Sequence, residues 1–555
     1  MEAKVHTPVY TMHKYFARRP WNVFNQLISH YSSPGDIVLD PFAGGGVTVV
    51  ESLKLRRRVV GVDVNPLAIY IASMETRPLD LHSFEETFSQ LKAKLKDEIC
   101  SLYVTRCEKC NELAIADWIE WDENKQWPIR LKYGCDKCGN AAQKATSKAD
   151  RELAEKIDHD FSRLIQQRKL WYPETSIPTG DKSHSLITQG FHFFHELFTK
   201  RNLIALAILF DAINGLQDTD ERDFLKFAFS SSLKWTSRLS HLRGRIVEGW
   251  AMHAYWVYPK SLEINVWNTF ERRTNALTRG KRYSSEHIGD YCRFAHAFSD
   301  IASGAATCLL LNRSSAQLPL PADSVDTIIT DPPYGGNVNY GELSDFWWVW
   351  LSGGATAEKR HEAVINRTQG KTIDEYEEIL VNVFSECYRV LKPERCLVST
   401  FNSKDIRVVA SFVKATSIAG FSLHPEGLLY QKPIRPYATT FHAMQIGAFV
   451  GDFIFTFLKT EVPSSVTKIE LIDLKSRLDE LMTETSKDEA AETKLRIRVY
   501  RALIPFLADR AKSDPTACQE AANYFEVKIR ERNDYFSQLR KHVIERRRKK
   551  FQHHP

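Results

Sequence analysis

Residues 36–51 read Asp-Ile-Val-Leu-Asp-Pro-Phe-Ala-Gly-Gly-Gly-Val-Thr-Val-Val-Glu. A short apolar strand runs into three glycines, and a stretch compatible with a helix follows. Glycine lets the backbone turn sharply and approach a ligand closely, as in nucleotide-binding crossovers. The order of strand, glycine loop and helix therefore predicts an α/β domain with a ligand at the loop. Taken alone, the element is also compatible with a loop that only caps a helix.

A second strand is expected over 59–63, and it ends in the acidic residue Asp63. An acid about 20 residues after a glycine loop, at the carboxyl end of the next strand, is placed to bind ribose hydroxyls. The glycines do not follow the Gly-x-Gly-x-x-Gly pattern, and no Gly-Lys-Ser or Gly-Lys-Thr follows them. These departures disfavour a dinucleotide or a nucleoside triphosphate as the ligand.

The tetrapeptide Asp331-Pro332-Pro333-Tyr334 follows another expected strand, residues 325–330. Each proline fixes φ near −65° and removes an amide donor, so the loop is stiff and rich in acceptors. Asp331 and the Pro332 carbonyl can each accept one N–H of a base amino group, and Tyr334 can stack on the ring. The alternative is an Asp-Pro turn that merely ends a strand.

Together the two motifs resemble the S-adenosylmethionine-dependent amino-methyltransferases that act on DNA bases. The closest resemblance is to the adenine-specific DNA methylases that carry a zinc ribbon, and it covers most of the chain to about residue 460. It rests on the glycine loop with 63–68, on 331–340 with its continuation 342–351, and on 13–20, which read His-Lys-Tyr-Phe-Ala-Arg-Arg-Pro. The resemblance implies S-adenosylmethionine as cofactor and double-stranded DNA as partner.

The resemblance also implies roles for individual residues. The loop 42–46 would line the methionine end of the cofactor, Asp63 would bind its ribose, and a segment around Ser315 would contact its adenosine. The full set expected at the cofactor is Asp40, Pro41, Phe42, Ala43, Gly44, Gly46, Asp63, Asn65 and Ser315. The set expected to hold the target base is Asp331, Pro332, Pro333 and Tyr334.

Four of the ten cysteines form two close pairs, Cys107-Glu-Lys-Cys110 and Cys135-Asp-Lys-Cys138. Two such knuckles match a tetrahedral four-thiolate zinc ribbon. Because four thiolates leave no open position for water, the zinc is expected to be structural. Four unrelated reduced thiols are the alternative. The remaining cysteines are scattered and are expected to be buried, unreactive thiols: Cys100, Cys292, Cys308, Cys387, Cys396 and Cys518.

The composition suits a large protein with two to four domains. The chain has 555 residues, is 43% hydrophobic and 26% charged, and carries a formal net charge of +6. This mild positive charge suits a polyanionic partner without requiring one. No apolar run approaches the ~18–20 residues of a membrane span, and the N-terminus lacks a secretion signal. We therefore expect a cytoplasmic protein, and the resemblance implies that it is nucleoid-associated and comes from a prokaryote or phage.

The positions of the motifs predict a Rossmann-like, doubly wound α/β methyltransferase sheet that is split by an insertion. Residues 1–80 are expected to form its first half and 296–460 its second, with strands at 309–311, 325–330, 396–401 and 452–457 and a helix over 372–391. The insertion, 81–295, would hold the zinc ribbon at about 100–145 and a helical stretch from about 152 to 273. A helical, basic extension would follow at 461–555.

Three further segments bear on nucleic-acid binding. The insertion carries basic and aromatic residues that suit phosphate contact and stacking, although each could equally be a core residue: Arg238, His241, Arg243, Arg245, Trp250, Tyr255, Trp256 and Tyr258. The aromatic run 346–351 favours a buried helix over a stacking surface. The basic block 546–550 could hold phosphates non-specifically.

These patterns favour methyl transfer to N6 of a flipped adenine in DNA, for restriction-modification or phage defence, with other subunits as optional partners. N4 of cytosine presents a similar amino group and remains an alternative. A DNA-binding subunit that has the methyltransferase fold without turnover is the second alternative.

Overall fold

A seven-stranded sheet forms the centre of the computed structural model, which describes residues 4–403, 405–431, 452–460, 469–483 and 489–532. The strand order is β10-β2-β1-β11-β12-β14-β13. The first five strands pair in parallel, and β14 pairs antiparallel with both β12 and β13. The bounds are β1 Ile37–Asp40, β2 Arg58–Asp63, β10 Cys308–Asn312, β11 Thr327–Thr330, β12 Cys396–Phe401, β13 Ser422–Gln431 and β14 Asp452–Leu458. The prediction of a mainly parallel sheet is confirmed, and β13 is a strand that the sequence did not suggest.

Side chains alternate between the two faces of this sheet, as the period of a strand requires. Ile37 and Leu39 of β1 join one hydrophobic core, whereas Val38 joins the other. Phe453, Phe455 and Phe457 of β14 lie in the same core as Leu39, and Ile454 lies in the core of Val38. Because both faces are covered, most of the central strands read as continuous apolar runs.

Helices cover each face. On the face of Val38 lie α1 (Trp21–Tyr31), α2 (Val47–Lys54), α3 (Pro66–Thr76) and α11 (Tyr340–Leu351). On the face of Leu39 lie α10 (Phe298–Ser303), α12 (Ile373–Val390) and α13 (Ile406–Ile418). In α11, Phe346, Trp347 and Trp350 are almost fully buried, which confirms the prediction of a buried aromatic helix.

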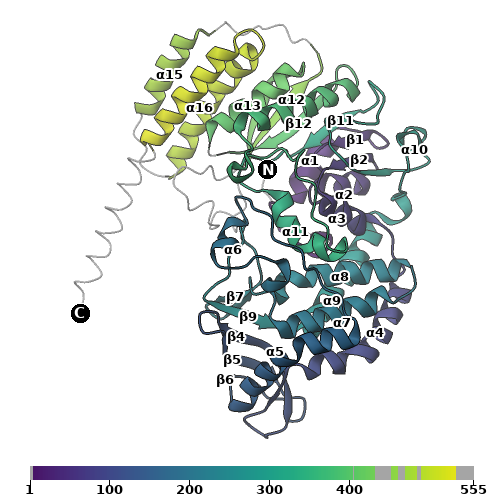
Figure 1. Ribbon diagram of the computed structural model, residues 1–555. Coiled ribbons are helices and arrows are strands. Elements are labelled where there is room, and N and C mark those ends of the chain that lie inside the picture. Colours follow the sequence, from purple (N-terminus) through teal and green to yellow (C-terminus); the bar gives the residue numbers. More distant parts are fainter. Residues whose placement is uncertain (1–3, 404, 432–451, 461–468, 484–488, 533–555) are drawn as a thin grey trace.

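The insertion forms the lower half of the molecule in Figure 1. Its helices are α4 (Leu81–Ser101), α5 (Lys148–Arg168), α6 (His184–Thr188), α7 (Lys200–Asn214), α8 (Asp220–Thr236) and α9 (Val266–His287). Its strands β3 (Val104–Arg106), β4 (Leu113–Asp122), β5 (Trp127–Gly134) and β6 (Ala141–Ala145) form an antiparallel sheet around the two cysteine pairs.

The helical stretch expected from about 152 to 273 is largely helical, but it also contains strands that the sequence did not suggest. This region contains a two-stranded hairpin, β7 (His241–Arg243) and β8 (Ile246–Glu248), and the strand β9 (Lys260–Ile264). Strand β9 pairs with β4, and its Leu262 and Ile264 pack on Trp118. Five alternating residues give a weak sequence signal, so tertiary pairing decides their conformation.

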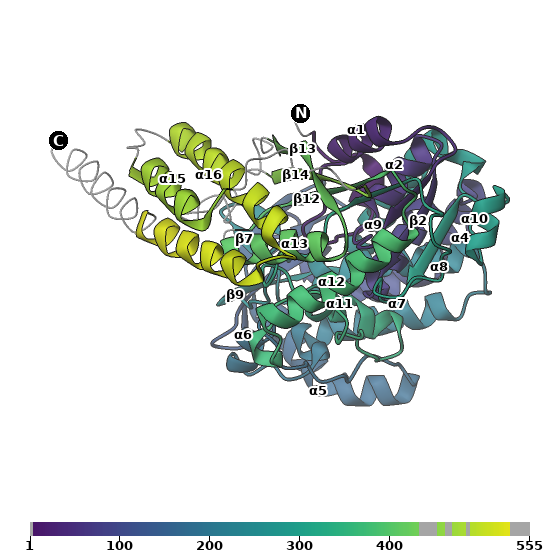
Figure 2. The same cartoon turned by 90° about the horizontal axis from the view of Figure 1, so that it is seen from above.

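The C-terminal helix α16 (Glu489–Arg510) packs beside α13, and α15 (Leu471–Thr483) packs on α16, as Figure 2 shows. A further helix covers 515–532. The basic block 546–550 lies outside the described residues. Within the described part of the chain, no helix is both long and apolar enough to cross a membrane.

The N-terminal arm, residues 4–20, connects the sheet domain to the insertion. The buried Tyr10 hydroxyl donates to Glu51 of α2 at 2.7 Å. On the other side, the Met12 carbonyl accepts from Ser231 of α8 and from Arg273 of α9, both at 2.8 Å. The arm is therefore held from both sides at the edge of the glycine loop.

Candidate active site

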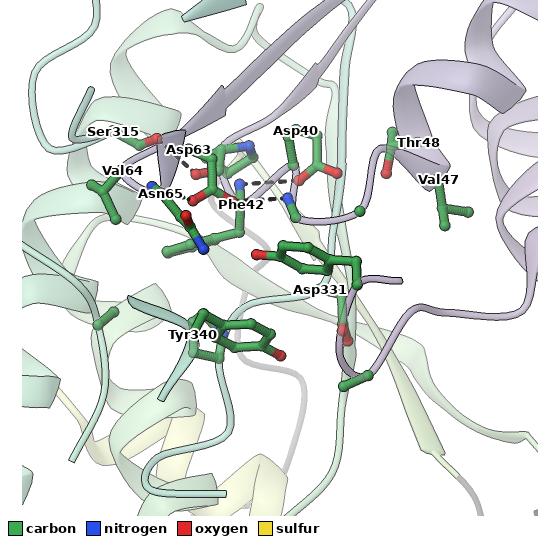
Figure 3. A pocket seen from close by; sticks show the side chains of 18 of the residues that line it. Asp40, Phe42, Val47, Thr48, Asp63, Val64, Asn65, Ser315, Asp331 and Tyr340 are labelled. Atoms are coloured by element: carbon green, nitrogen blue, oxygen red, sulfur yellow. Dashed lines mark hydrogen bonds between the residues drawn. The ribbon is translucent and has the colours of Figure 1, made fainter. Parts of the chain in front are cut away.

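One pocket lies at the carboxyl ends of β1, β2 and β11, where the strand order reverses around β1. In doubly wound sheets this crevice is where ligands bind. Its walls come from the N-terminal arm, the glycine loop, the segment after β2, Ser314–Ser315, the loop after β11, α11 and residues 361–363. Figure 3 shows Asp40, Asp63 and Ser315 on one side of this pocket and Tyr340 on the opposite side.

The glycines of the loop have two separate functions. Gly44 and Gly45 line the pocket, and Gly44 has a positive φ of 47°. Gly46, with φ 75°, precedes α2, and a Cβ on it would lie 3.0 Å from the Ala72 Cβ. Gly46 is thus needed for the turn and for packing. It does not line the pocket, although the resemblance implied that it contacts the cofactor.

Asp63 lies at the end of β2 and lines the pocket. Its two carboxylate oxygens accept from the backbone amides of Gly44 and Asn65, each at 2.8 Å. Burial raises the pKa of Asp63 to about 6, and the two amides oppose this rise. The carboxylate is therefore held in one orientation with further lone pairs free to accept.

Asn65 and Ser315 are tied to the protein by their own hydrogen bonds. The Asn65 side chain caps α3 by accepting from Leu67 N at 3.1 Å and donates to Ser344 at 2.7 Å. The Ser315 hydroxyl donates to the Pro41 carbonyl at 2.7 Å. Both residues line the pocket, but these bonds give each of them a structural function as well.

Asp40 lies deeper than Asp63. One of its oxygens accepts from Thr330 Oγ1 at 2.6 Å and from Phe42 N at 3.1 Å. Burial, with a smaller contribution from the nearby Asp331, raises the pKa of Asp40 to about 6. Asp40 thus joins the end of β1 to the end of β11 and carries the backbone of Pro41, Phe42 and Ala43 along the pocket wall.

Asp331 lies directly after β11, beside the glycine loop. Its Oδ1 accepts from Thr400 Oγ1 at 2.5 Å and from the Tyr334 hydroxyl, and its Oδ2 accepts from Arg19 Nε at 2.5 Å. Asp331 and Pro333 line the pocket, whereas Pro332 is buried behind it. The Pro333 carbonyl accepts from Tyr376 at 2.7 Å, which fixes the loop.

Several residues of the pocket were not selected from the sequence, among them Tyr15, Arg19, Tyr340 and Glu362. Tyr15 and Tyr340 stack with ring centroids 5.6 Å apart, and Tyr15 lies against Gly44 and Gly45. Glu362 accepts from Gly341 N at 2.9 Å, and burial raises its pKa to about 7. Tyr15, Arg19 and Tyr340 lie in segments quoted for the resemblance, but no local pattern indicates Glu362.

The sequence was compared with known proteins. A family profile described as "DNA methylase", for N6 and N4 methylases, matches residues 2–74 and 325–501. These two segments contain the glycine loop, Asp63 and the Asp-Pro-Pro-Tyr motif. The chain belongs to this DNA methylase family.

Individual relatives of the methylase family match more weakly. Type II methyltransferase M.MvaI from Kocuria varians is 22% identical over 323 residues, which is 56% of this chain and 50% of that protein. Type II methyltransferase M.MjaII from Methanocaldococcus jannaschii is 27% identical over 84 residues, 15% of this chain and 14% of that protein. The chain thus spans half or less of the curated relatives it matches.

One solved structure is also similar in part. It is described as a candidate DNA modification methylase from Thermus thermophilus, with 15% identity and a TM-score of 0.16. The similarity covers 31% of this chain and 60% of that one.

The methylase profile leaves out residues 75–324, and this part contains the four-cysteine cluster. The ligand atoms of Cys107, Cys110, Cys135 and Cys138 lie within 4.8 Å of one another. The Sγ atoms of Cys107 and Cys138, and those of Cys110 and Cys135, are 3.6 Å apart. A tetrahedral zinc with Zn–S bonds of about 2.3 Å needs S···S separations of about 3.8 Å. The donor set therefore fits zinc.

Proposed function

We propose that this chain transfers the methyl group of S-adenosylmethionine to N6 of an adenine flipped out of double-stranded DNA. The observation that carries the proposal is the position of Asp331, which shares one pocket with the glycine loop and Asp63. Membership of the DNA methylase family supports the reaction type. Bound there, S-adenosylmethionine would supply an electrophilic methyl carbon on a positively charged sulfur.

The residues of this chain would bind the cofactor, position the target base and activate its amino group. Asp63 accepts ribose hydroxyls, and the loop from Pro41 to Gly45 provides a wall of the pocket. The arm packs so closely on this loop that a Cβ at Gly45 would lie 2.8 Å from Arg18 Nε. The adenine amine is a poor nucleophile because its lone pair is delocalised into the ring. Asp331 and the Pro332 carbonyl accept its two N–H groups and so favour a pyramidal nitrogen in line with the methyl group. Tyr334 stacks on the flipped base.

Two features argue against other reactions. Carbon-5 methylation of cytosine needs a cysteine nucleophile, and the residues that line the described pocket include none. An intact Asp331 and glycine loop argue against a subunit without turnover. Methylation at N4 of cytosine is the remaining alternative, because the same two acceptors would hold its amino group.

We assign DNA contact to the insertion, because some of its basic and aromatic side chains are exposed. Trp250 and Tyr255 are buried and stack on each other, and Arg238 pairs with Glu123, so these three belong to the core. Arg243 and Arg245 are exposed at the β7–β8 turn, and Trp256 lies exposed nearby in sequence. These three are the proposed phosphate and stacking contacts.

A structural zinc ion in the four-cysteine cluster belongs to the same proposal. We also propose a place in restriction-modification or phage defence, which the type II methyltransferase names of the two relatives support.

The proposal is tested by incubating the protein with tritiated S-adenosylmethionine and mixed plasmid DNA, followed by mass spectrometry of the nucleosides. N6-methyladenine is the expected product. Appearance of 4-methylcytosine would assign the alternative base. If the protein binds the cofactor but labels no DNA, the reading as a subunit without turnover replaces the proposal.

A further inference from the structure

The N-terminal arm places a guanidinium group against the Asp-Pro-Pro-Tyr motif. Arg19 donates from Nε to Asp331 at 2.5 Å, from Nη1 to Asp452 at 3.1 Å, and from Nη2 to the Tyr334 hydroxyl. The side chains of Arg19 and Asp331 are each only 16% exposed. The guanidinium carbon lies 4.7 Å from the centroid of the Tyr334 ring.

These contacts coincide with the ones assigned to the target base. A guanidinium is planar and rich in N–H donors, as is the amino edge of adenine. It donates to Asp331, which would accept the base amine, and it lies near the face of Tyr334, on which the base would stack. Asp331 Oδ1 already accepts two hydrogen bonds, so the base amine would use Oδ2, the oxygen that Arg19 holds. A base stacked on Tyr334 would also lie where the guanidinium lies.

We propose that Arg19 occupies the target-base subsite while no DNA is bound, balances the charge of Asp331 there, and is displaced when the base enters. The inference rests on the proposed function and extends it, because it assigns a positioning residue outside the four-residue motif. Arg19 acts through Asp331 and does not touch the reacting atoms.

The surroundings of Asp331 explain why a counter-charge is needed. Thr400 on β12 and Tyr334 on its own loop donate neutral hydrogen bonds to it. Asp40 at the end of β1 and Tyr340 on α11 interact with it electrostatically, and Asp452 on β14 shares the Arg19 guanidinium. Burial raises the pKa of Asp331, and Arg19 is the first of the groups that lower it. Among the residues that the structure describes, removal of Arg19 would leave Asp331 as a buried carboxylate near two other acids and without a cation in contact.

The test compares Arg19→Gln and Arg19→Lys with the wild type, by measuring tritiated-methyl transfer to plasmid DNA from pH 5.5 to 9. The pH dependence of kcat/KM reports groups of the enzyme before DNA binds, and that of kcat reports the complex. In Arg19→Gln the acid limb of kcat/KM should move up by about 1–3 pH units, the effect of losing an adjacent opposite charge. The acid limb of kcat should move much less, because the base has already replaced Arg19 in the complex.

Arg19→Lys keeps the cation and should keep the acid limb of the wild type. An ammonium has no planar face to lie on Tyr334, so its displacement should be easier and the KM for DNA should fall several-fold. This variant carries the test if Arg19→Gln does not fold, and an unchanged or raised KM would then overturn the inference. Arg395→Ala, exposed after α12, is the control for loss of an arginine. Calorimetry with S-adenosylmethionine and thermal unfolding verify that each variant is folded and loaded.

Equal movement of both acid limbs in Arg19→Gln would mean that Arg19 stays beside Asp331 during turnover, which overturns the displacement. No movement of either limb overturns the charge-balancing function. If the wild type binds cofactor and methylates no DNA, the proposed function fails and the inference falls with it. If the wild type is active but the acid limbs of kcat/KM and kcat in Arg19→Gln do not move as expected, only the inference fails.

Discussion

Asp63 and Asp331 are both buried carboxylates in one pocket, but their partners differ in kind. Asp63 accepts from two backbone amides, which cannot leave without unfolding the loop. Asp331 accepts from three side chains, and one of them belongs to the N-terminal arm. At the residue scale, Asp63 is therefore a fixed acceptor, and Asp331 is an acceptor whose partners can be exchanged.

The proposed function of Asp331 predicts a selective loss of chemistry. Asp331→Ala should lower methyl transfer by at least about 100-fold, the scale for losing one group that stabilises the transition state. Affinity for S-adenosylmethionine, measured by calorimetry, should change by only a few-fold. Asp374→Ala, on the exposed first turn of α12, is the control. Equal loss of binding and turnover in a folded Asp331→Ala protein would contradict the assignment.

The proposed function of Asp63 predicts a loss of binding. Asp63→Ala should weaken S-adenosylmethionine binding by about 2–3 kcal/mol, the scale of charge-assisted hydrogen bonds. Calorimetry measures this directly, and unchanged affinity would remove Asp63 from the cofactor site.

The raised pKa of Asp63 gives a separate prediction about pH. The ionised carboxylate is the better acceptor, and its pKa in the free protein is about 6. The affinity for S-adenosylmethionine should therefore be constant above pH 6 and fall about tenfold per pH unit below it. Asp40 titrates in the same range, so Asp63→Asn is the matched variant. Asp63→Asn should bind S-adenosylmethionine more weakly, and its affinity should fall less steeply below pH 6. If the affinity of this variant falls as steeply as that of the wild type, another group causes the fall.

At the scale of elements, the four cysteines lie together in the turns that follow β3 and β5 in the small sheet. Tyr133 and Asn140 lie 3.9 Å from the Cys107 sulfur as donors, in the manner of groups that support a metal-bound thiolate. Asn111 and Gly139 adopt positive φ values of 58° and 65° after each knuckle, which brings the sulfurs together. The chain in this region is thus shaped around a four-sulfur centre.

Loss of one thiolate should melt this sheet while leaving the cofactor pocket intact. The purified protein should contain one zinc per chain by elemental analysis, and Cys110→Ser should lose it. Hydrogen exchange should then rise in β3–β6, with S-adenosylmethionine affinity retained, because the pocket is built from other elements. Cys396→Ser, a lone half-buried thiol in the central sheet, is the control. A zinc-free wild type would contradict the metal assignment.

At the scale of the whole molecule, the insertion and the sheet domain are joined at the pocket by the N-terminal arm. Phe16 of the arm lines the pocket, and its ring lies 5.0 Å from that of Trp250 in the insertion. Tyr255 of the insertion donates to the Glu342 carbonyl of α11 at 2.8 Å. A protein surface that binds DNA can therefore extend from the β7–β8 hairpin toward the pocket.

This arrangement predicts that the hairpin contributes to DNA affinity through phosphate contacts. In the double variant Arg243→Ala with Arg245→Ala, the slope of log K against log salt should decrease in magnitude by about 2. Fluorescence anisotropy on labelled duplex DNA measures this slope. Arg163→Ala with Arg168→Ala, on α5, removes the same charge elsewhere and should leave it nearly unchanged. Equal slopes for both double variants would contradict DNA contact by the hairpin.

The amino-acid sequence by itself determined the strands of the central sheet except β13, the glycine loop, the stiff Asp-Pro-Pro-Tyr loop and the cysteine pairs. These features depend on local backbone restriction and on side-chain period, which neighbouring residues carry. It also placed Asp63 and Asp331 correctly at strand ends, because parallel strands end at a common edge. Only the tertiary structure brought Arg19 to Asp331 across 312 residues, placed Glu362 in the pocket and buried Trp250 and Tyr255. Such contacts depend on how distant elements pack, so a short sequence pattern does not contain them.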